Sequence, residues 1–533
     1  MKVMRSKQRP TTSLLRGKPT LPLLILAFLF IAALCLRLYG IGEPLMDFVA
    51  VRQYHGALLA RGFYQWLQTG VMRTLPPDGV LEPPILELIS SAGYVLLGKE
   101  HLWLPRALSA LFWTGGGAFV YLTARRLFSW SAALISTTFY LLLPYGILAG
   151  RAFMPDPLMV MMLCSSVYAV VRYNEEPSKR RLLLASAASA LAVFAKPGIV
   201  AFQIFGAFAA TSIHQRGLKR SLADSRSFLF AALTVLPTAL YYLYGTYFAD
   251  FLQGEMQRKV IPSYLLDPDF WRGWLNCVEA VTGYVAFSLG LVGVLLCRSA
   301  TARVLLVGLW GGYLIFGSVF TFHIHTHDYY SLQLIPVVAL SLGALWDAAE
   351  DRFWRARSGV RAALLVLCCL IVAVGLAEHR KSIRDTAYAL GGGDSKRKVS
   401  KHILPADYEA RARVYRQIGK VTHHSSRTIF AAPDWGYPLI YHGRIDGEYW
   451  PDPGMWSWLR SNGRAPESNR WHYWAALRSE HSPEYFVVIK QAEPKATSWR
   501  EDKPLVSITK DYPMVARNSL YVVFDLRIGR KSG

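Results

Sequence analysis

The chain has 533 residues, of which 53% are hydrophobic and 18% are charged, and 59 Lys and Arg residues against 36 Asp and Glu residues give a formal charge of +23. An average soluble chain is about 25% charged, so this composition excludes a disordered protein and argues against a string of ordinary soluble domains. The basic residues fall in short clusters between apolar runs. That distribution predicts a membrane topology rather than a nucleic-acid-binding face.

The first apolar segment, from Leu21 to about Leu38, is long enough to cross a bilayer, whereas the core of a cleavable signal peptide has about 7–15 residues. We therefore expect a retained membrane anchor. Similar runs follow along the chain and predict a polytopic α-helical membrane protein with about eleven transmembrane helices. The predicted spans are 21–39, 105–124, 131–149, 157–172, 182–196, 198–213, 225–245, 276–296, 303–321, 330–347 and 361–378.

Clusters of Arg and Lys occupy nearly every second gap between these spans, for example Arg125 with Arg126 and the segment 352–361. Because cytoplasmic loops carry an excess of Lys and Arg, the N-terminus is predicted to be cytoplasmic. An odd number of spans then places the C-terminus outside. We expect a protein of the plasma (inner) membrane with an extracytoplasmic C-terminal domain.

Composition also suggests a division of the chain into three domains. These are a basic cytoplasmic tail (1–20), a transmembrane catalytic domain (21–378) and a mixed α/β extracytoplasmic domain (379–533). The first outside loop, 40–104, is predicted to contain two helices that lie at the membrane interface. The predicted elements are helices over 47–68, 84–97 and 408–421, and strands over 428–432, 485–490 and 520–526.

Polar residues, most of them ionisable, gather on the predicted outer side, where separate loops deliver them. Such groups are costly at membrane depth and are usually functional or paired. A carboxylate together with several cations suits an anionic, phospholipid-like substrate. The set comprises Asp47, Arg52, Gln53, Glu82, Arg106, Arg151, Asp156, Lys196 and the segment from His323 to Asp328.

Several short pieces carry a family resemblance in their order and spacing. They are the stretch from Asp47 to Tyr64, Glu82-Pro83-Pro84, Leu104 to Ala110, Arg151 to Pro157, Phe194 to Gly198, and His327 to Tyr330 ahead of Pro336. Over about residues 20–380 the chain resembles the GT-C glycosyltransferases of the protein-O-mannosyltransferase and lipid A aminoarabinose transferase superfamily. One position departs from that pattern, because Glu82 stands where the aminoarabinose transferases carry Lys.

The resemblance implies transfer of a sugar from a polyprenyl phosphate to an acceptor hydroxyl at the outer face, with inversion. The acceptor would be a lipid, a glycan or a protein. It implies that Asp47 is the catalytic base and that Asp156 is a second acidic residue of the site. A departing phosphate needs fixed positive charge, and Arg52, Lys196, Arg151 and Arg106 are the candidates. The residues expected to line the substrate are Gln53, Glu82, His327, Asp328, Tyr329 and Tyr330.

Each assignment has a structural alternative. Asp47 is also placed to cap a helix, and Asp156 to pair with Arg151. Lys196 would otherwise extend to the membrane interface, and Arg106 would contact lipid headgroups. In the C-terminal domain, Trp435, Tyr449, Trp450, Trp456 and Trp458 would either stack on sugars or belong to a core or interface belt.

The expected sugar transfer from a polyprenyl phosphate requires no cofactor. A divalent metal is an alternative, because His323, His325 and His327 would share one face of an extended segment. The six cysteines suggest neither a disulfide framework nor a metal site. Two other functions stay open: a transporter or flippase of a lipid-linked or anionic substrate, and a non-catalytic assembly protein.

Overall fold

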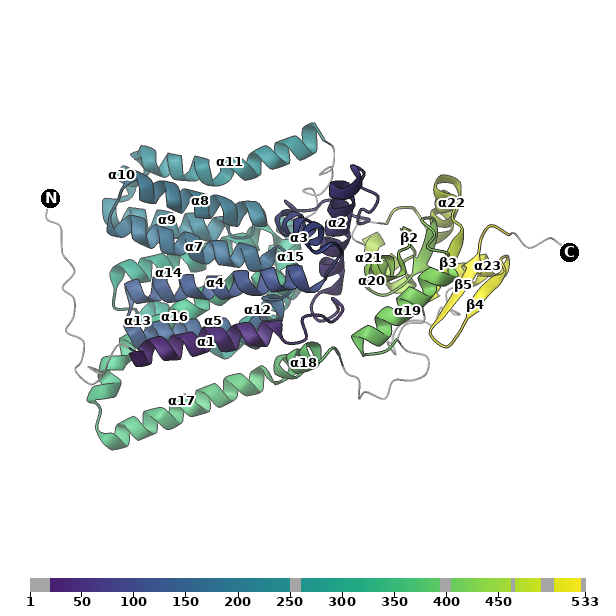
Figure 1. Ribbon diagram of the computed structural model, residues 1–533. Coiled ribbons are helices and arrows are strands. Elements are labelled where there is room, and N and C mark those ends of the chain that lie inside the picture. The colour runs from purple at the N-terminus through teal and green to yellow at the C-terminus, as the bar shows by residue number, and fades with distance from the viewer. Residues whose placement is uncertain (1–19, 250–259, 394–403, 462–464, 490–502, 529–533) are drawn as a thin grey trace.

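The computed structural model describes residues 20–249, 260–393, 404–461, 465–489 and 503–528 (Figure 1). A bundle of long helices forms the larger part, and a smaller part built around a β-sheet lies at one end of the bundle. The largely helical architecture and the C-terminal sheet expected from the sequence are confirmed.

Each of the eleven predicted spans contains at least one helix. Five helices are long and apolar enough to cross a membrane, namely α1, α4, α11, α14 and α17, and the bent pair α12 and α13 would make a sixth among the described residues. The number of crossings above six stays a prediction. The bundle consists of α1 (Thr20–Leu38), α4 (Trp103–Leu127), α5 (Trp130–Leu142), α6 (Pro144–Ala149), α7 (Asp156–Glu175), α8 (Lys179–Ala195), α9 (Ala201–Arg216), α10 (Leu218–Ala223), α11 (Ser225–Tyr247), α12 (Pro268–Thr282), α13 (Tyr284–Leu296), α14 (Ala300–Val319), α16 (Leu334–Arg355) and α17 (Ser358–Glu378).

Two predicted spans are broken rather than straight. The span 276–296 turns by 91° between α12 and α13, where Gly283 has a φ of 74°, a left-handed conformation that glycine adopts without strain. The span 131–149 is interrupted at Leu143, because the residue before a proline is driven out of the helical region, and Pro144 begins α6. The turn at Gly283 packs against Glu378 and His379 at the end of α17.

Close backbone approach between α9 and α14 depends on glycine. A Cβ atom at Gly206 would lie 2.3 Å from the carbonyl oxygen of Gly308. Small residues let helices pack closely in membranes, where no hydrophobic force drives them together.

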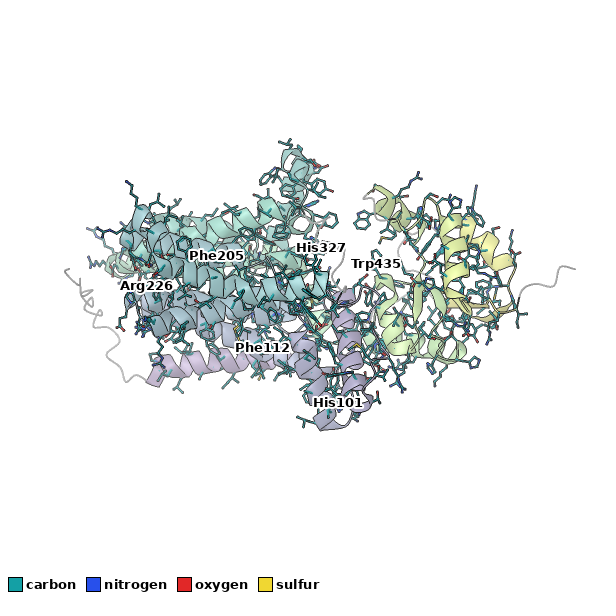
Figure 2. The ribbon with its side chains drawn as sticks, turned by 90° about the horizontal axis from the view of Figure 1, so that it is seen from above. His101, Phe112, Phe205, Arg226, His327 and Trp435 are labelled. Atoms are coloured by element: carbon teal, nitrogen blue, oxygen red, sulfur yellow. The ribbon has the colours of Figure 1, made fainter. Side chains whose placement is uncertain are left out.

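Short elements cover the end of the bundle that faces the sheet (Figure 1). Helix α2 runs across this end, and α3, α15 and α18 lie beside it. The helices predicted over 47–68 and 84–97 are therefore present, although α2 begins three residues later. These elements are α2 (Ala50–Thr69), α3 (Ile85–Leu97), η2 (Pro262–Leu266), α15 (Thr321–Ile324), η3 (Asp328–Ser331) and α18 (Arg380–Leu390). Arg226, in the first turn of α11, lies at the opposite end (Figure 2).

Among the residues that the structure describes, the C-terminal sheet has five strands in the order β2-β1-β3-β5-β4. Strand β1 runs parallel to β2 and β3, while β5 runs antiparallel to β3 and β4. The helix predicted over 408–421 and all three predicted strands are present, and two short edge strands were missed. The elements are α19 (Tyr408–Val421), β1 (Thr428–Ala431), η4 (Asp434–Gly436), α20 (Tyr437–Gly443), β2 (Gly447–Tyr449), α21 (Pro453–Ser461), α22 (Arg470–His481), β3 (Tyr485–Ile489), α23 (Lys503–Lys510), β4 (Met514–Arg517) and β5 (Tyr521–Asp525).

One hydrophobic core joins the sheet to the end of the bundle. Tyr54 of α2 and Tyr94 of α3 belong to the same buried cluster as Tyr415 of α19 and Phe430 of β1. The Tyr54 hydroxyl also lies 2.7 Å from Nε2 of His442 on α20. The C-terminal part is thus packed directly on the first loop of the bundle.

Candidate functional site

The carboxylate of Asp47 lies in a buried cluster at the end of the bundle. Its Oδ2 accepts hydrogen bonds from Nε of Arg151, at 2.9 Å, and from Nη2 of Arg106. Its Oδ1 accepts one from Nε2 of Gln53, at 3.1 Å. The side chains of Asp47 and both arginines are almost fully buried. Two guanidinium groups compensate the buried carboxylate, which would otherwise be very costly.

Both arginines also hold the backbone that precedes Asp47. Arg106 donates to the carbonyl oxygens of Ile41 at 3.1 Å and Glu43 at 2.9 Å. Arg151 donates to the carbonyl oxygens of Tyr39 and Gly40. The two side chains thereby fix the turn that carries Asp47 from α1 toward α2.

Two structural alternatives for these residues are wrong. Arg106 does not reach lipid headgroups, because its side chain is fully buried against Asp47. Asp47 does not cap α2, since the N-cap residue is Val49 and no side chain caps that end.

A second buried ion pair joins α7 to the end of α8. Nζ of Lys196 lies 2.8 Å from Oδ1 and 2.9 Å from Oδ2 of Asp156. The ammonium group also lies 4.9 Å from the ring centre of Tyr329 and 4.8 Å from that of Tyr330, in cation–π contact. The alternatives are again wrong: Lys196 is buried rather than extended to the interface, and Asp156 pairs with Lys196 instead of Arg151.

Arg52 and Glu82 form a third pair, 2.6 Å apart between Nη2 and Oε1. Burial raises the pKa of Glu82, but the charges of Arg52 and Lys196 outweigh burial and lower it to about 2. Glu82 is therefore ionised at neutral pH. Glu82 stands where the aminoarabinose transferases carry Lys. Its carboxylate therefore pairs with Arg52, and the site does not gain a further positive charge at this position.

The pair of Arg52 and Glu82 is linked to both other groups. Gln53, which follows Arg52 on α2, donates to Asp47, and the charge of Lys196 acts on Glu82. Four cations face three carboxylates in these ion-paired groups, which leaves a formal charge of +1.

Sequence reasoning missed Glu87, a buried carboxyl on α3 near these ion-paired groups. Burial raises the pKa of Glu87 to about 7. In the sequence, the position of Glu87 shortly after Glu82-Pro83-Pro84 did not indicate a buried carboxyl group.

The histidine segment is compact and helical rather than extended, so the expectation that three histidines share one strand face is wrong. Nδ1 of His325 lies 2.7 Å from the carbonyl oxygen of Thr321, and its ring packs on Phe270. The rings of His323 and His327 lie 5.5 Å apart, beside Tyr330. Across the described ranges, no cluster of three or more His, Cys, Asp or Glu residues is arranged to hold a metal ion. Asp328 begins η3 next to Tyr329.

The structure divides the aromatic residues of the C-terminal part into two groups. Trp450 and Trp456 are buried, as expected of core residues, and Trp450 stacks on Tyr473. Trp435 and Trp458 are exposed. In Figure 2, Trp435 lies on the side of the C-terminal part that faces His327 at the end of the bundle.

Comparison with known proteins agrees with the resemblance seen in the sequence. The family model for dolichyl-phosphate-mannose-protein mannosyltransferases matches residues 81–242. None of the curated proteins matches this chain.

Solved structures share the fold over most of the chain. ArnT from Cupriavidus metallidurans bound to undecaprenyl phosphate is similar with a TM-score of 0.57 and 14% identity, over 94% of this chain and 98% of that one. Its apo state gives a TM-score of 0.56 with 15% identity and the same coverage. The apo oligosaccharyltransferase of Archaeoglobus fulgidus gives 0.53 with 14% identity, over 89% of this chain and 70% of that chain. The expected GT-C membrane fold is therefore confirmed.

Proposed function

We propose that this protein is a membrane glycosyltransferase that moves a sugar from a polyprenyl phosphate to an acceptor hydroxyl. The observation that carries the proposal is the buried Asp47 carboxylate, fixed by two arginines beside Arg52 and Lys196. The family match, and the undecaprenyl phosphate in a structure of the same fold, support a lipid-phosphate donor. The sugar would be a hexose or a pentose.

In the proposed reaction the acceptor oxygen attacks the anomeric carbon as the bond from that carbon to the phosphate oxygen breaks. The electron pair of the broken bond stays on the phosphate, and the configuration inverts. Asp47 accepts the acceptor proton through Oδ1, because Oδ2 already accepts from two guanidinium groups. Gln53, which donates to Oδ1, orients that oxygen.

The phosphate-binding cations are Arg52 and Lys196 in this proposal. Each is held by a single carboxylate side chain and retains capacity for a second anion. Arg106 and Arg151, predicted from the sequence for the same task, donate to Asp47 and to backbone carbonyl groups instead. We assign them to positioning Asp47, and Asp156 to positioning Lys196.

Fixed positive charge favours an anionic donor. The ion-paired side chains alone sum to +1, so a sugar phosphodiester meets an excess of positive charge among them. As the bond breaks, negative charge grows on the phosphate beside Arg52 and Lys196, and fixed cations stabilise that transition state. Glu82, His327, Asp328, Tyr329 and Tyr330 would line the substrates.

The proposed topology places this end of the bundle and residues 379–533 outside the plasma (inner) membrane, with the N-terminus in the cytoplasm. The basic clusters between the predicted spans support this topology. Arg226, in the first turn of α11, lies at the end of the bundle far from the site (Figure 2). The transmembrane catalytic domain would comprise residues 21–378, after the basic tail 1–20. The extracytoplasmic location lets a lipid-linked sugar of the outer leaflet reach Asp47.

The test uses full-length protein in detergent, mixed with a panel of polyprenyl phosphate hexoses and pentoses and with membrane extract as the source of acceptor. Mass spectrometry measures free polyprenyl phosphate for the wild type and for Asp47→Asn. We expect release by the wild type alone. No release with any donor, from folded protein and a panel consumed by a known transferase, would overturn the proposal.

A transporter or flippase is the competing function. Wild-type protein in sealed vesicles would then move a lipid-linked sugar between leaflets without consuming it. The clustering of these four ion pairs at one end of the bundle favours chemistry at that end over passage through both leaflets.

A further inference from the structure

A second cationic pocket lies where α2 and α3 meet the C-terminal part. The cavity has a volume of about 440 Å³. Arg61 is nine residues beyond Arg52 on α2, about 14 Å at 1.5 Å per residue, so this pocket is separate from the site around Asp47. The pocket is lined by two tyrosines, Tyr64 and Tyr441, and by Arg61, Lys99, Glu100, Arg416, His442 and Arg444.

Positive charge in this pocket is only partly compensated. Glu100 accepts from Nε of Arg61 at 2.9 Å, and Arg416 pairs with Glu409 outside the lining. Lys99 and Arg444 form no ion pair with any other residue in the described ranges. Four cations thus face one carboxylate of the lining.

The pKa of the partly buried histidine of the pocket depends first on burial and then on the neighbouring cations. Burial, and then the charges of Arg416 and Arg61, lower the pKa of His442 to about 3. The imidazole is therefore neutral at physiological pH and adds no cation of its own. The field that acts on it comes from guanidinium groups of both parts of the protein.

The cations reach the pocket from two sides. Arg61 and Lys99 belong to the first loop of the bundle, whereas Arg416 lies on α19 and Arg444 follows α20. Arg444 has a φ of 51°, which is uncommon for a residue other than glycine. An anion held between the two sides would offset their repulsion and join them.

Exposed apolar side chains lie on α2 and α3, the two helices of the bundle next to the pocket. Leu96, at the end of α3, is 88% exposed, and Trp66 on α2 is 50% exposed. Lys99 follows Leu96 by three residues. His101, in the connection from α3 to α4, marks this corner at the edge of the molecule in Figure 2. A ligand that fits both features carries an anionic headgroup and acyl chains.

We propose that this pocket binds the phosphate headgroup of an anionic phospholipid of the outer leaflet and that the bound headgroup stabilises the contact between α2 and α20. Arginine binds phosphate through paired N–H groups, and lysine adds a compact charge. Basic pockets next to an apolar surface recognise lipid headgroups by this combination. The acyl chains would lie on the exposed side chains of α2 and α3.

The experiment measures lipid binding by native mass spectrometry and thermal unfolding of the full chain, so it does not depend on turnover. The protein is titrated with phosphatidylglycerol, with zwitterionic phosphatidylcholine and with inorganic phosphate. Lys99→Gln with Arg444→Gln is compared with Arg460→Gln with Lys510→Gln, which removes two exposed cations elsewhere.

We expect phosphatidylglycerol to bind the wild type and raise its unfolding temperature, with no such effect of phosphatidylcholine. The pocket variant should bind phosphatidylglycerol about tenfold more weakly, while the control variant binds as the wild type does. Equal binding by both variants would overturn the proposal. An equal stabilisation by inorganic phosphate would overturn the lipid assignment and leave a free-anion site. If the double variant fails to fold, Lys99→Gln alone makes the same comparison.

Discussion

Nε of Arg151 donates to Oδ2 of Asp47 at 2.9 Å, although the two residues are 104 positions apart in the sequence. The same guanidinium group also holds the backbone of Tyr39 and Gly40. A residue that the motif offered as a phosphate ligand is thus a structural support for the proposed base. Arg52, by contrast, contacts a single carboxylate.

This difference predicts separate outcomes for the two arginines. Arg151→Lys should lower the free energy of unfolding by about 2 kcal/mol and reduce turnover, because an ammonium group cannot reach all the acceptors of the guanidinium group. Arg52→Lys should change stability by less than about 1 kcal/mol and weaken donor binding. Thermal unfolding and steady-state kinetics measure both effects, and equal losses of stability would contradict the assignment.

The buried pair of Asp156 and Lys196 allows a double-variant test. Asp156→Leu or Lys196→Met alone should destabilise the protein by about 3–5 kcal/mol, since each leaves an uncompensated buried charge. The combined variant should regain most of that stability while remaining inactive. Unfolding of all four proteins in the same detergent gives the coupling energy, and additive losses would show that the pair is not coupled.

Glu87 predicts a pH dependence of stability. Burial raises its pKa from 4.5 to about 7, so the folded state binds the proton more tightly than the unfolded state does. Its contribution is complete below pH 4.5 and is lost as the pH rises through 7, by up to about 3 kcal/mol.

Replacing the carboxyl with an amide removes this titration. Glu87→Gln should therefore stabilise the protein at pH 8 and change it little at pH 4.5. Thermal unfolding of both proteins between these values tests the sign. A stability difference that stays constant with pH would show that Glu87 does not titrate in this range.

The contact between α9 and α14 predicts a large effect from one methyl group. Gly206→Ala would place its Cβ 2.3 Å from the carbonyl oxygen of Gly308 and should cost about 1–3 kcal/mol. Gly311→Ala on α14 is the matched control, because no described atom beyond its chain neighbours and the adjacent backbone of its own helix lies within 4 Å of its Cβ position. Equal unfolding temperatures for the two variants would contradict the packing.

Local patterns determined most of the secondary structure. The helix predicted over 408–421 is α19, and runs of β-branched and aromatic residues located β1, β3 and β5. The edge strands β2 and β4 were missed because each is short and takes its pairing from a distant strand. The bend at Gly283 was missed because the hydropathy of 276–296 is continuous across it.

The sequence by itself determined that the protein is a polytopic helical membrane protein with a C-terminal α/β part, because hydropathy and charge are summed over short windows. The sequence also identified the ionisable residues that form the three ion-paired groups of the site. Only the tertiary structure decided their partners: Asp47 with Arg106 and Arg151, Asp156 with Lys196, and Arg52 with Glu82. Ion pairing depends on distances of a few ångströms between helices far apart in the chain, and residue type alone does not specify those distances.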